Sequence, residues 1–169
     1  MSNLMDLKKL TPGARALLRV LSMFDGDSVP QELLTDAAKD VELEDYPSNE
    51  KAYAEACEAL LGKALVTRKD DLSSLQVREQ VQNTVCDELD PDLFPAVFNA
   101  AIVLLHDITK YLSIEVQPDE VREYQRHVAR LRSVLEEQGI ETVKPRLLAA
   151  ELFNESSRQV PISGIFPPD

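Results

Sequence analysis

The histidines and cysteines, which could perform acid, base, nucleophilic or metal chemistry, are few in this 169-residue chain, and they are scattered. His106 and His127 are its two histidines, and each falls in a separate helical stretch with no serine or cysteine spaced for a catalytic pair. A histidine in such a place is more often a partly exposed helix residue than a catalyst. Cys57 and Cys86 lie in different predicted helices and outside any metal-ligand motif, so we expect free thiols, buried or half-buried.

Two acidic clusters are the remaining candidates for a metal site. They are Glu42, Glu44 and Asp45, and then Asp87, Glu88, Asp90 and Asp92. Neither has the spacing and the glycine of a calcium-binding loop, so we expect both to be solvated surface. The chain also lacks a phosphate-binding loop, a zinc-protease motif and a nucleophile elbow. The sequence therefore predicts no enzyme, no metal site, and no cofactor bound by this chain alone.

Charge narrows the class of partner. The net charge is −12, and both halves of the chain are acidic, so phosphate backbones and anionic membranes would repel it. The apolar runs are too short to span a bilayer, and residues 1–10 lack the apolar region of a signal peptide. We expect a cytoplasmic protein with no membrane partner.

The elements that position these residues are organised around residues 10–77. Thr11 is a good helix N-cap, and Pro12 suits a first helical turn. A second helix starts at Pro30, and a third runs from Ser48, its expected cap, to Lys63. Residues 64–77 then alternate as two strands around a polar tip. Three helices followed by a hairpin predict a winged helix.

Everything after the wing has helical periodicity. The expected helices cover residues 80–89, 91–112, 118–138 and a stretch opening at Lys144-Pro145, before an extended tail at 161–169. The predicted fold class is mostly α, a winged helix followed by a helical bundle or the start of an α-solenoid. We divide the chain into a winged-helix domain at 1–78, a helical arm at 79–143, and a first repeat helix with tail at 144–169. The expected winged-helix core is Leu17, Leu21, Phe24, Leu60, Leu65 and Val77.

Several segments together resemble the winged-helix and arm region of NLR-like STAND ATPases, particularly fungal ones with tetratricopeptide arrays. Leu21 to Leu34, "LSMFDGDSVPQELL", follows the family's "leu-ser-x-phe/leu-asp-pro-asp-x-ile-pro" and "glu-x-leu-leu" most closely. The other similar segments are Thr11 to Val20, Ala59 to Arg68, Leu75 to Gln82, Tyr124 to Leu131 with its "his-val-x-x-leu" pattern, and Ala150 to Asn154 at the first repeat helix.

The resemblance implies a module between an ATPase core and a C-terminal sensor array, as in innate immunity proteins. In the family, the winged helix packs on the nucleotide-binding domain at rest and swings away on activation. A histidine after the second wing strand is thought to reach the phosphate of bound ADP. Arg78 takes that place here, and Glu79 replaces the arginine that follows. A guanidinium can also meet a phosphate, so Arg78 is the candidate nucleotide sensor, or else a surface arginine.

The resemblance further implies a P-loop ATPase domain as partner, in the same polypeptide or another, with ADP or ATP bound there. The candidate interface residues are Asp25, Asp27, Pro30 and His127.

Two other functions stay open. A free-standing adaptor that binds other protein domains would show an exposed apolar face on residues 91–112. A DNA-binding winged helix would need Arg, Asn or Gln on its third helix, where Glu50, Glu55 and Glu58 stand instead. The activating ligand, the downstream effector, the oligomeric state and whether the chain is a fragment do not follow from the sequence.

Overall fold

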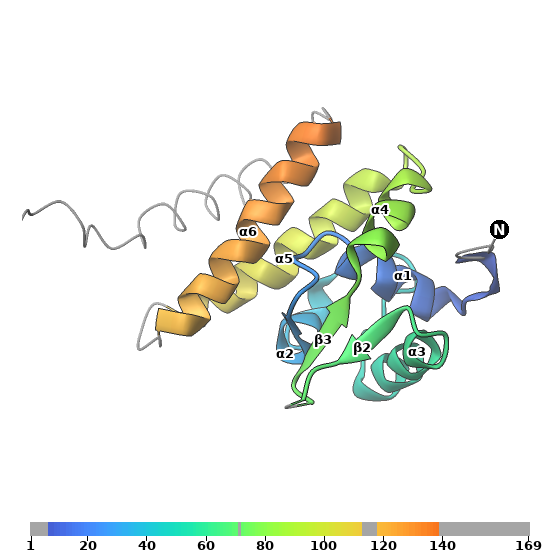
Figure 1. Cartoon of the computed structure of the whole chain (residues 1–169), viewed down its shortest axis with the longest axis horizontal. Coiled ribbons are helices and arrows are strands. Elements are labelled where there is room, and N and C mark those ends of the chain that lie inside the picture. Colours follow the sequence, from blue (N-terminus) through green and yellow to red (C-terminus); the bar gives the residue numbers. More distant parts are fainter. Residues whose placement is uncertain (1–6, 71, 113–117, 139–169) are drawn as a thin grey trace, which may run out of the picture.

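A computed structural model describes residues 7–70, 72–112 and 118–138. This part of the chain is mostly helical, with a small antiparallel sheet, which confirms the predicted fold class (Figure 1). In chain order the elements are η1 (Leu7–Lys9), α1 (Pro12–Leu21), β1 (Val29–Pro30), α2 (Gln31–Thr35), η2 (Ala38–Asp40), α3 (Glu50–Gly62), β2 (Val66–Arg68), β3 (Ser74–Val77), α4 (Glu79–Asp87), α5 (Phe94–Leu112) and α6 (Pro118–Gln138).

The wing is a three-stranded sheet with the order β1, β3, β2. β2 and β3 form the predicted hairpin, in which Val66 pairs with Val77. β1 is an additional edge strand, whose Val29 pairs with Leu75. The sequence predicts a helix start at Pro30 rather than a strand, because two residues carry no alternating pattern and Pro30 has no N–H to give to a ladder. The central strand of the wing is therefore β3, which leads directly into α4.

α1 begins where the sequence predicts. Thr11 Oγ1 accepts a hydrogen bond from the third helical N–H at 3.3 Å, and Pro12 is the first helical residue. Arg15, in the first turn of the same helix, is half-buried. Its guanidinium donates to the carbonyl oxygens of Leu7 at 3.0 Å and Leu10 at 3.1 Å. Because a guanidinium is a rigid fork of donors, one side chain satisfies several carbonyls of the segment before α1.

The third helix starts one residue later than expected. Asn49, not Ser48, is its N-cap, and the Asn49 side chain accepts from the N–H of Ala52 at 2.9 Å. Both residue types cap helices well, so the sequence leaves the start ambiguous by one position. In the connector before α3, Tyr46 is buried and its hydroxyl donates to the carbonyl oxygen of Leu34 at 2.8 Å.

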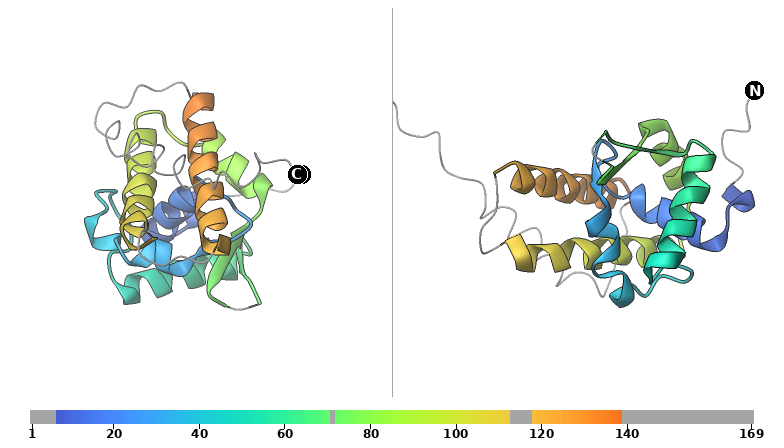
Figure 2. Two further views of the ribbon diagram at one scale, coloured as in Figure 1. Left: turned by 90° about the vertical axis from the view of Figure 1, so that its left-hand side faces the viewer. Right: turned by 90° about the horizontal axis from the view of Figure 1, so that it is seen from below.

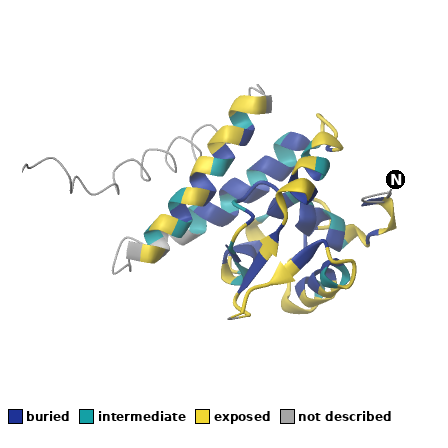
Figure 3. Cartoon of the chain, in the orientation of Figure 1, coloured by how far each residue is buried: buried dark blue, intermediate teal, exposed yellow. Residues whose placement is uncertain are grey.

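The arm consists of α4, α5 and α6, and α5 lies beside α6 (Figure 2). Pro95 is the second residue of α5, where its missing N–H costs no helical hydrogen bond. α5 also contacts α1 and α2. Its residues are buried or half-buried throughout 94–107, so the helix packs against neighbours on more than one side (Figure 3).

One hydrophobic core runs through the described residues, from Leu7 to Val134. It crosses the expected boundary at residue 78 without interruption, since α1 contacts both α4 and α5. The division into domains stays a prediction. Cys57 is a buried free thiol and Cys86 a half-buried one, as expected. All six expected core residues are buried: Leu17, Leu21, Phe24, Leu60, Leu65 and Val77.

Several predictions concern residues outside the described part. They are the repeat helix and tail at 144–169 and the similar segment from Ala150 to Asn154. The choice between a closed bundle and the start of a solenoid therefore stays a prediction. Within the described part, no helix is both long and apolar enough to cross a membrane.

Candidate functional site at the turn after α1

The turn that follows α1 is the point where the winged helix meets the arm. α1 is capped by Ser22, which is fully buried and whose hydroxyl donates to the carbonyl oxygen of Leu18 at 2.8 Å. Residues 24–28, called the 24–28 turn below, then reverse the chain toward β1. The Asp25 carboxylate accepts from the N–H of Asp27 at 3.0 Å, a local bond that shapes the turn.

The end of the wing is joined to this turn by Gly26. The carbonyl oxygen of Gly26 accepts from the N–H of Val77, the last residue of β3, at 2.8 Å. A Cβ atom at position 26 would collide with the carbonyl oxygen of Val77 and would lie 2.9 Å from the side chain of Gln82. Only glycine allows so close an approach, so the turn and the end of β3 are held in one arrangement.

α4 holds the same turn through Gln82. This side chain is 6% exposed, and its Nε2 donates to the carbonyl oxygen of Phe24 at 2.8 Å. A buried glutamine costs free energy unless it is hydrogen-bonded, so this bond stabilises both α4 and the turn. Gln82 was not among the expected site residues. The signal in the sequence is a glutamine beside Val81, next to the apolar stripe of a short helix.

The arm reaches the turn from the other side through His127 of α6. His127 is 2% exposed, and its Nδ1 accepts a hydrogen bond from the backbone N–H of Asp25 at 3.1 Å. Its ring also meets the ring of Phe24 edge to face, with centroids 5.4 Å apart. An Nδ1 that accepts from an amide carries no proton, so the imidazole is neutral with its hydrogen on Nε2.

Burial is the main reason that the ring stays neutral. Desolvation lowers the pKa of His127 from 6.5 to about 4, although the carboxylates of Asp25 and Glu123 and the backbone of Ser28 act in the opposite direction. The nearby Arg126 adds to the lowering. The Nε2 atom is buried and makes no hydrogen bond within the described residues.

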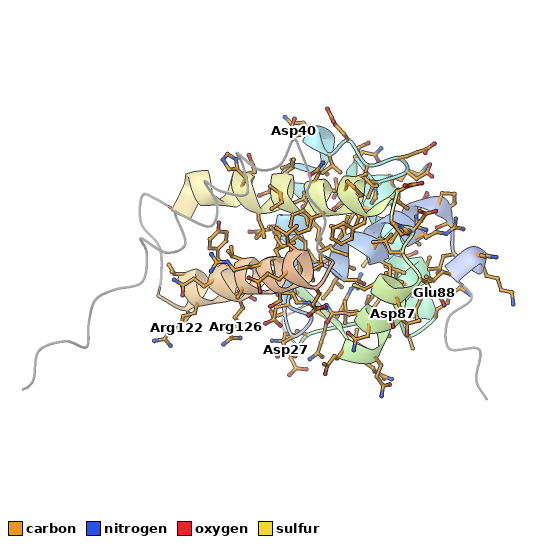
Figure 4. All side chains as sticks on the ribbon, turned by 90° about the horizontal axis from the view of Figure 1, so that it is seen from above. Asp27, Asp40, Asp87, Glu88, Arg122 and Arg126 are labelled. Carbon is orange, nitrogen blue, oxygen red and sulfur yellow. The ribbon has the colours of Figure 1, made fainter. Side chains whose placement is uncertain are left out.

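Of the four expected interface residues, the structure brings Asp25 and His127 into direct contact. Asp25 and His127 bind each other within the chain, so His127 does not face an outside partner in this arrangement. Asp27 is exposed beside them, and Pro30 belongs to β1. Arg126 projects from α6 on the side away from α5, into solvent (Figure 4).

Arg78, the expected nucleotide sensor, lies directly after β3. It is the N-cap residue of α4, and its carbonyl oxygen accepts from the N–H groups of Val81 and Gln82. Its side chain is exposed. The backbone of Arg78 is therefore fixed between two residues that hold the 24–28 turn, Val77 and Gln82, while its guanidinium is presented to solvent.

A hollow of about 320 Å³ opens near the starts of α1 and α3. Its lining includes Thr11, Gly13, Tyr46 and the carboxylates of Asp45 and Glu55. Thr11 and Tyr46 already make hydrogen bonds within the chain. In the described residues, no group of three or more histidine, cysteine, aspartate or glutamate side chains is placed to hold a metal ion.

Comparison with known proteins finds a match to one protein family. A family described as "Domain of unknown function (DUF7779)" matches residues 5–94, which is more than half of the chain. The matched segment contains the winged helix, the 24–28 turn and α4, and it ends at the first residue of α5. No curated protein and no solved structure matches the chain.

Proposed function

The chain belongs to the DUF7779 family, and we propose that it is a non-catalytic regulatory and interaction module of an NLR-like STAND signalling ATPase. It relays nucleotide state between the ATPase core and a C-terminal sensor array. The observation that carries the proposal is the 24–28 turn, which is bonded to the end of the wing through Gly26 and to the arm through Asp25. A relay needs such a shared element, because two surfaces influence each other only through a common packed structure.

The resemblance to STAND proteins supports the same interpretation. Its strongest segment, Leu21 to Leu34, builds the end of α1, the 24–28 turn, β1 and most of α2. The segment at Leu75 to Gln82 supplies β3, Arg78 and the glutamine that holds the turn. The segment at Tyr124 to Leu131 supplies His127. Three stretches noted for their similarity therefore meet at one junction.

Arg78 is the residue of this module that we assign to nucleotide sensing. Its guanidinium is exposed, and its backbone is held by α4. An arginine presents a fork of donors that matches a phosphate group. A phosphate contact at Arg78 would act on a residue adjacent to Val77, whose N–H is bonded to the 24–28 turn.

The alternatives have less support. The sign expected of a free-standing adaptor was an exposed apolar face on residues 91–112, and no large apolar side chain in 91–107 is exposed. For DNA binding, Glu50, Glu55 and Glu58 are exposed on α3, and these would repel a phosphate backbone. The adaptor remains as an outcome of the binding test.

The test is a calorimetric titration of the full chain with the P-loop ATPase domain of a STAND protein, loaded with ADP or with a non-hydrolysable ATP analogue. We expect tighter association with the ADP form. Arg78→Ala should weaken that association about ten-fold or more, because it removes a charge-assisted contact. Arg122→Ala is the matched control, since Arg122 is exposed on α6, and it should leave the affinity unchanged. A folded chain that binds neither form would refute the proposal and favour the adaptor.

A further inference from the structure

The 24–28 turn is bonded more tightly to the wing and α4 than to α6 of the arm. On the wing side, Gly26 is bonded to Val77 with no room for a Cβ atom, and Gln82 donates to Phe24 at 2.8 Å. On the arm side, the hydrogen bond to α6 is made by one side chain, His127, at 3.1 Å. The contacts with β3 and α4 are therefore the tighter ones.

α6 has a narrow apolar face with which to hold itself in place. Its buried apolar residues are Tyr124, Val128, Leu131 and Val134. The neighbouring positions include exposed, charged residues such as Arg122, Arg126 and Glu136. Exposed and buried positions alternate along α6 in Figure 3. α5, in contrast, buries apolar residues on more than one side. Of the two long helices, α6 is the one that can leave the core with the smaller loss of buried apolar surface.

We infer that His127 is a latch: the molecule opens by releasing α6 from the 24–28 turn, while the turn stays joined to β3 and α4. The open form would expose the ring of Phe24 and the N–H of Asp25, which are covered in the closed form. This inference concerns the chain by itself and goes beyond the proposed function, since it holds with or without an ATPase partner.

Native-state hydrogen exchange of the full chain tests the latch, because it reports the opening of each amide separately. The Asp25 amide reports the arm side of the turn and the Val77 amide the wing side. We expect the Asp25 protection factor to be lower than that of Val77 by about ten-fold or more. Opening at Asp25 and at Leu131 of α6 should also depend weakly on denaturant, as expected of a local opening, whereas opening at Val77 should depend strongly on it.

Two variants of the latch residue sharpen the test. His127→Phe keeps an aromatic ring but removes the acceptor, so the Asp25 protection factor should fall by a further factor of about ten while that of Val77 is unchanged. His127→Asn places an amide oxygen near the position of Nδ1, so it should recover part of the protection at Asp25.

The latch would be overturned if the opening free energy and its dependence on denaturant were the same at Asp25, Leu131 and Val77. That result would show that the turn, α6 and the wing open together as one cooperative unit. It would also be overturned if His127→Phe lowered protection at Val77 as much as at Asp25. The measurement on the wild-type chain decides the question alone if the variants do not fold.

Discussion

The backbone N–H of Asp25 donates a hydrogen bond to Nδ1 of His127 across 102 residues of sequence. It joins the turn after the first helix to the last described helix, and it requires a neutral imidazole. Both residues were expected at an interface with another domain, and in the structure they are hydrogen-bonded to each other. The relay that we propose depends on this internal contact.

Stability should depend on pH through His127. Its pKa falls from 6.5, the ordinary value of an exposed histidine, to about 4 in the folded chain, because the ring is buried. His127 therefore binds a proton more readily in the unfolded chain than in the folded one. The contribution of the neutral ring to the free energy of unfolding is fully present above pH 6.5, and it is lost as the pH falls toward 4. At about 1.4 kcal/mol for each pKa unit, the loss is about 3 kcal/mol. Urea unfolding between about pH 7.5 and pH 4 measures it.

Carboxylates titrate in the same range, so the informative quantity is the difference in unfolding free energy between wild type and His127→Phe. That difference should shrink as the pH falls. His106→Asn, at the other histidine, should leave the pH dependence of stability as it is in the wild type. A difference between wild type and His127→Phe that stays constant with pH would contradict the assignment of a neutral, buried ring.

Gly26→Ala should destabilise the fold by about 2 kcal/mol or more, since the added methyl group meets the backbone of β3 and the side chain of Gln82. The matched control is Gly62→Ala, because a Cβ atom there meets nothing within 4 Å and Gly62 lies at the end of α3. That change should stabilise the chain by up to about 1 kcal/mol. Thermal unfolding of both variants measures these changes in stability. Equal changes in the two variants would mean that the turn and the wing are not tightly packed against each other.

Gln82→Ala should cost about 1–3 kcal/mol, because the carbonyl oxygen of Phe24 loses its buried donor. Asn83→Ala, at the next position and exposed, should change stability by less than about 0.5 kcal/mol. Chemical unfolding curves give both values. Similar costs for the two variants would show that the bond from Gln82 to Phe24 contributes little.

Local patterns were sufficient to predict much of the fold. The Thr11-Pro12 pair marks the start of α1, and the six apolar residues expected in the winged-helix core are buried. These predictions depend on neighbours within a few residues in the sequence, where capping and periodicity act.

The candidate site was predictable only in part, because its contacts are distant in the sequence. Gln82 binds a carbonyl 58 residues away, and Arg15 turns back onto the segment before its own helix. A polar residue beside an apolar stripe has the same local pattern whether it faces water or a distant backbone group. The edge strand at Val29–Pro30 was missed for a similar reason, because its partner strand, β3, comes after α3 in the sequence.

The most direct test of the relay is a double-mutant cycle between Gln82→Ala and His127→Phe. The two side chains bind opposite sides of the 24–28 turn. If the turn couples the wing to the arm, loosening one side should lessen the cost of losing the other. We expect the double variant to be less destabilised than the sum of the single variants by about 0.5–1 kcal/mol or more. Additive costs would show that the wing and the arm are held independently, and would contradict a relay through this turn.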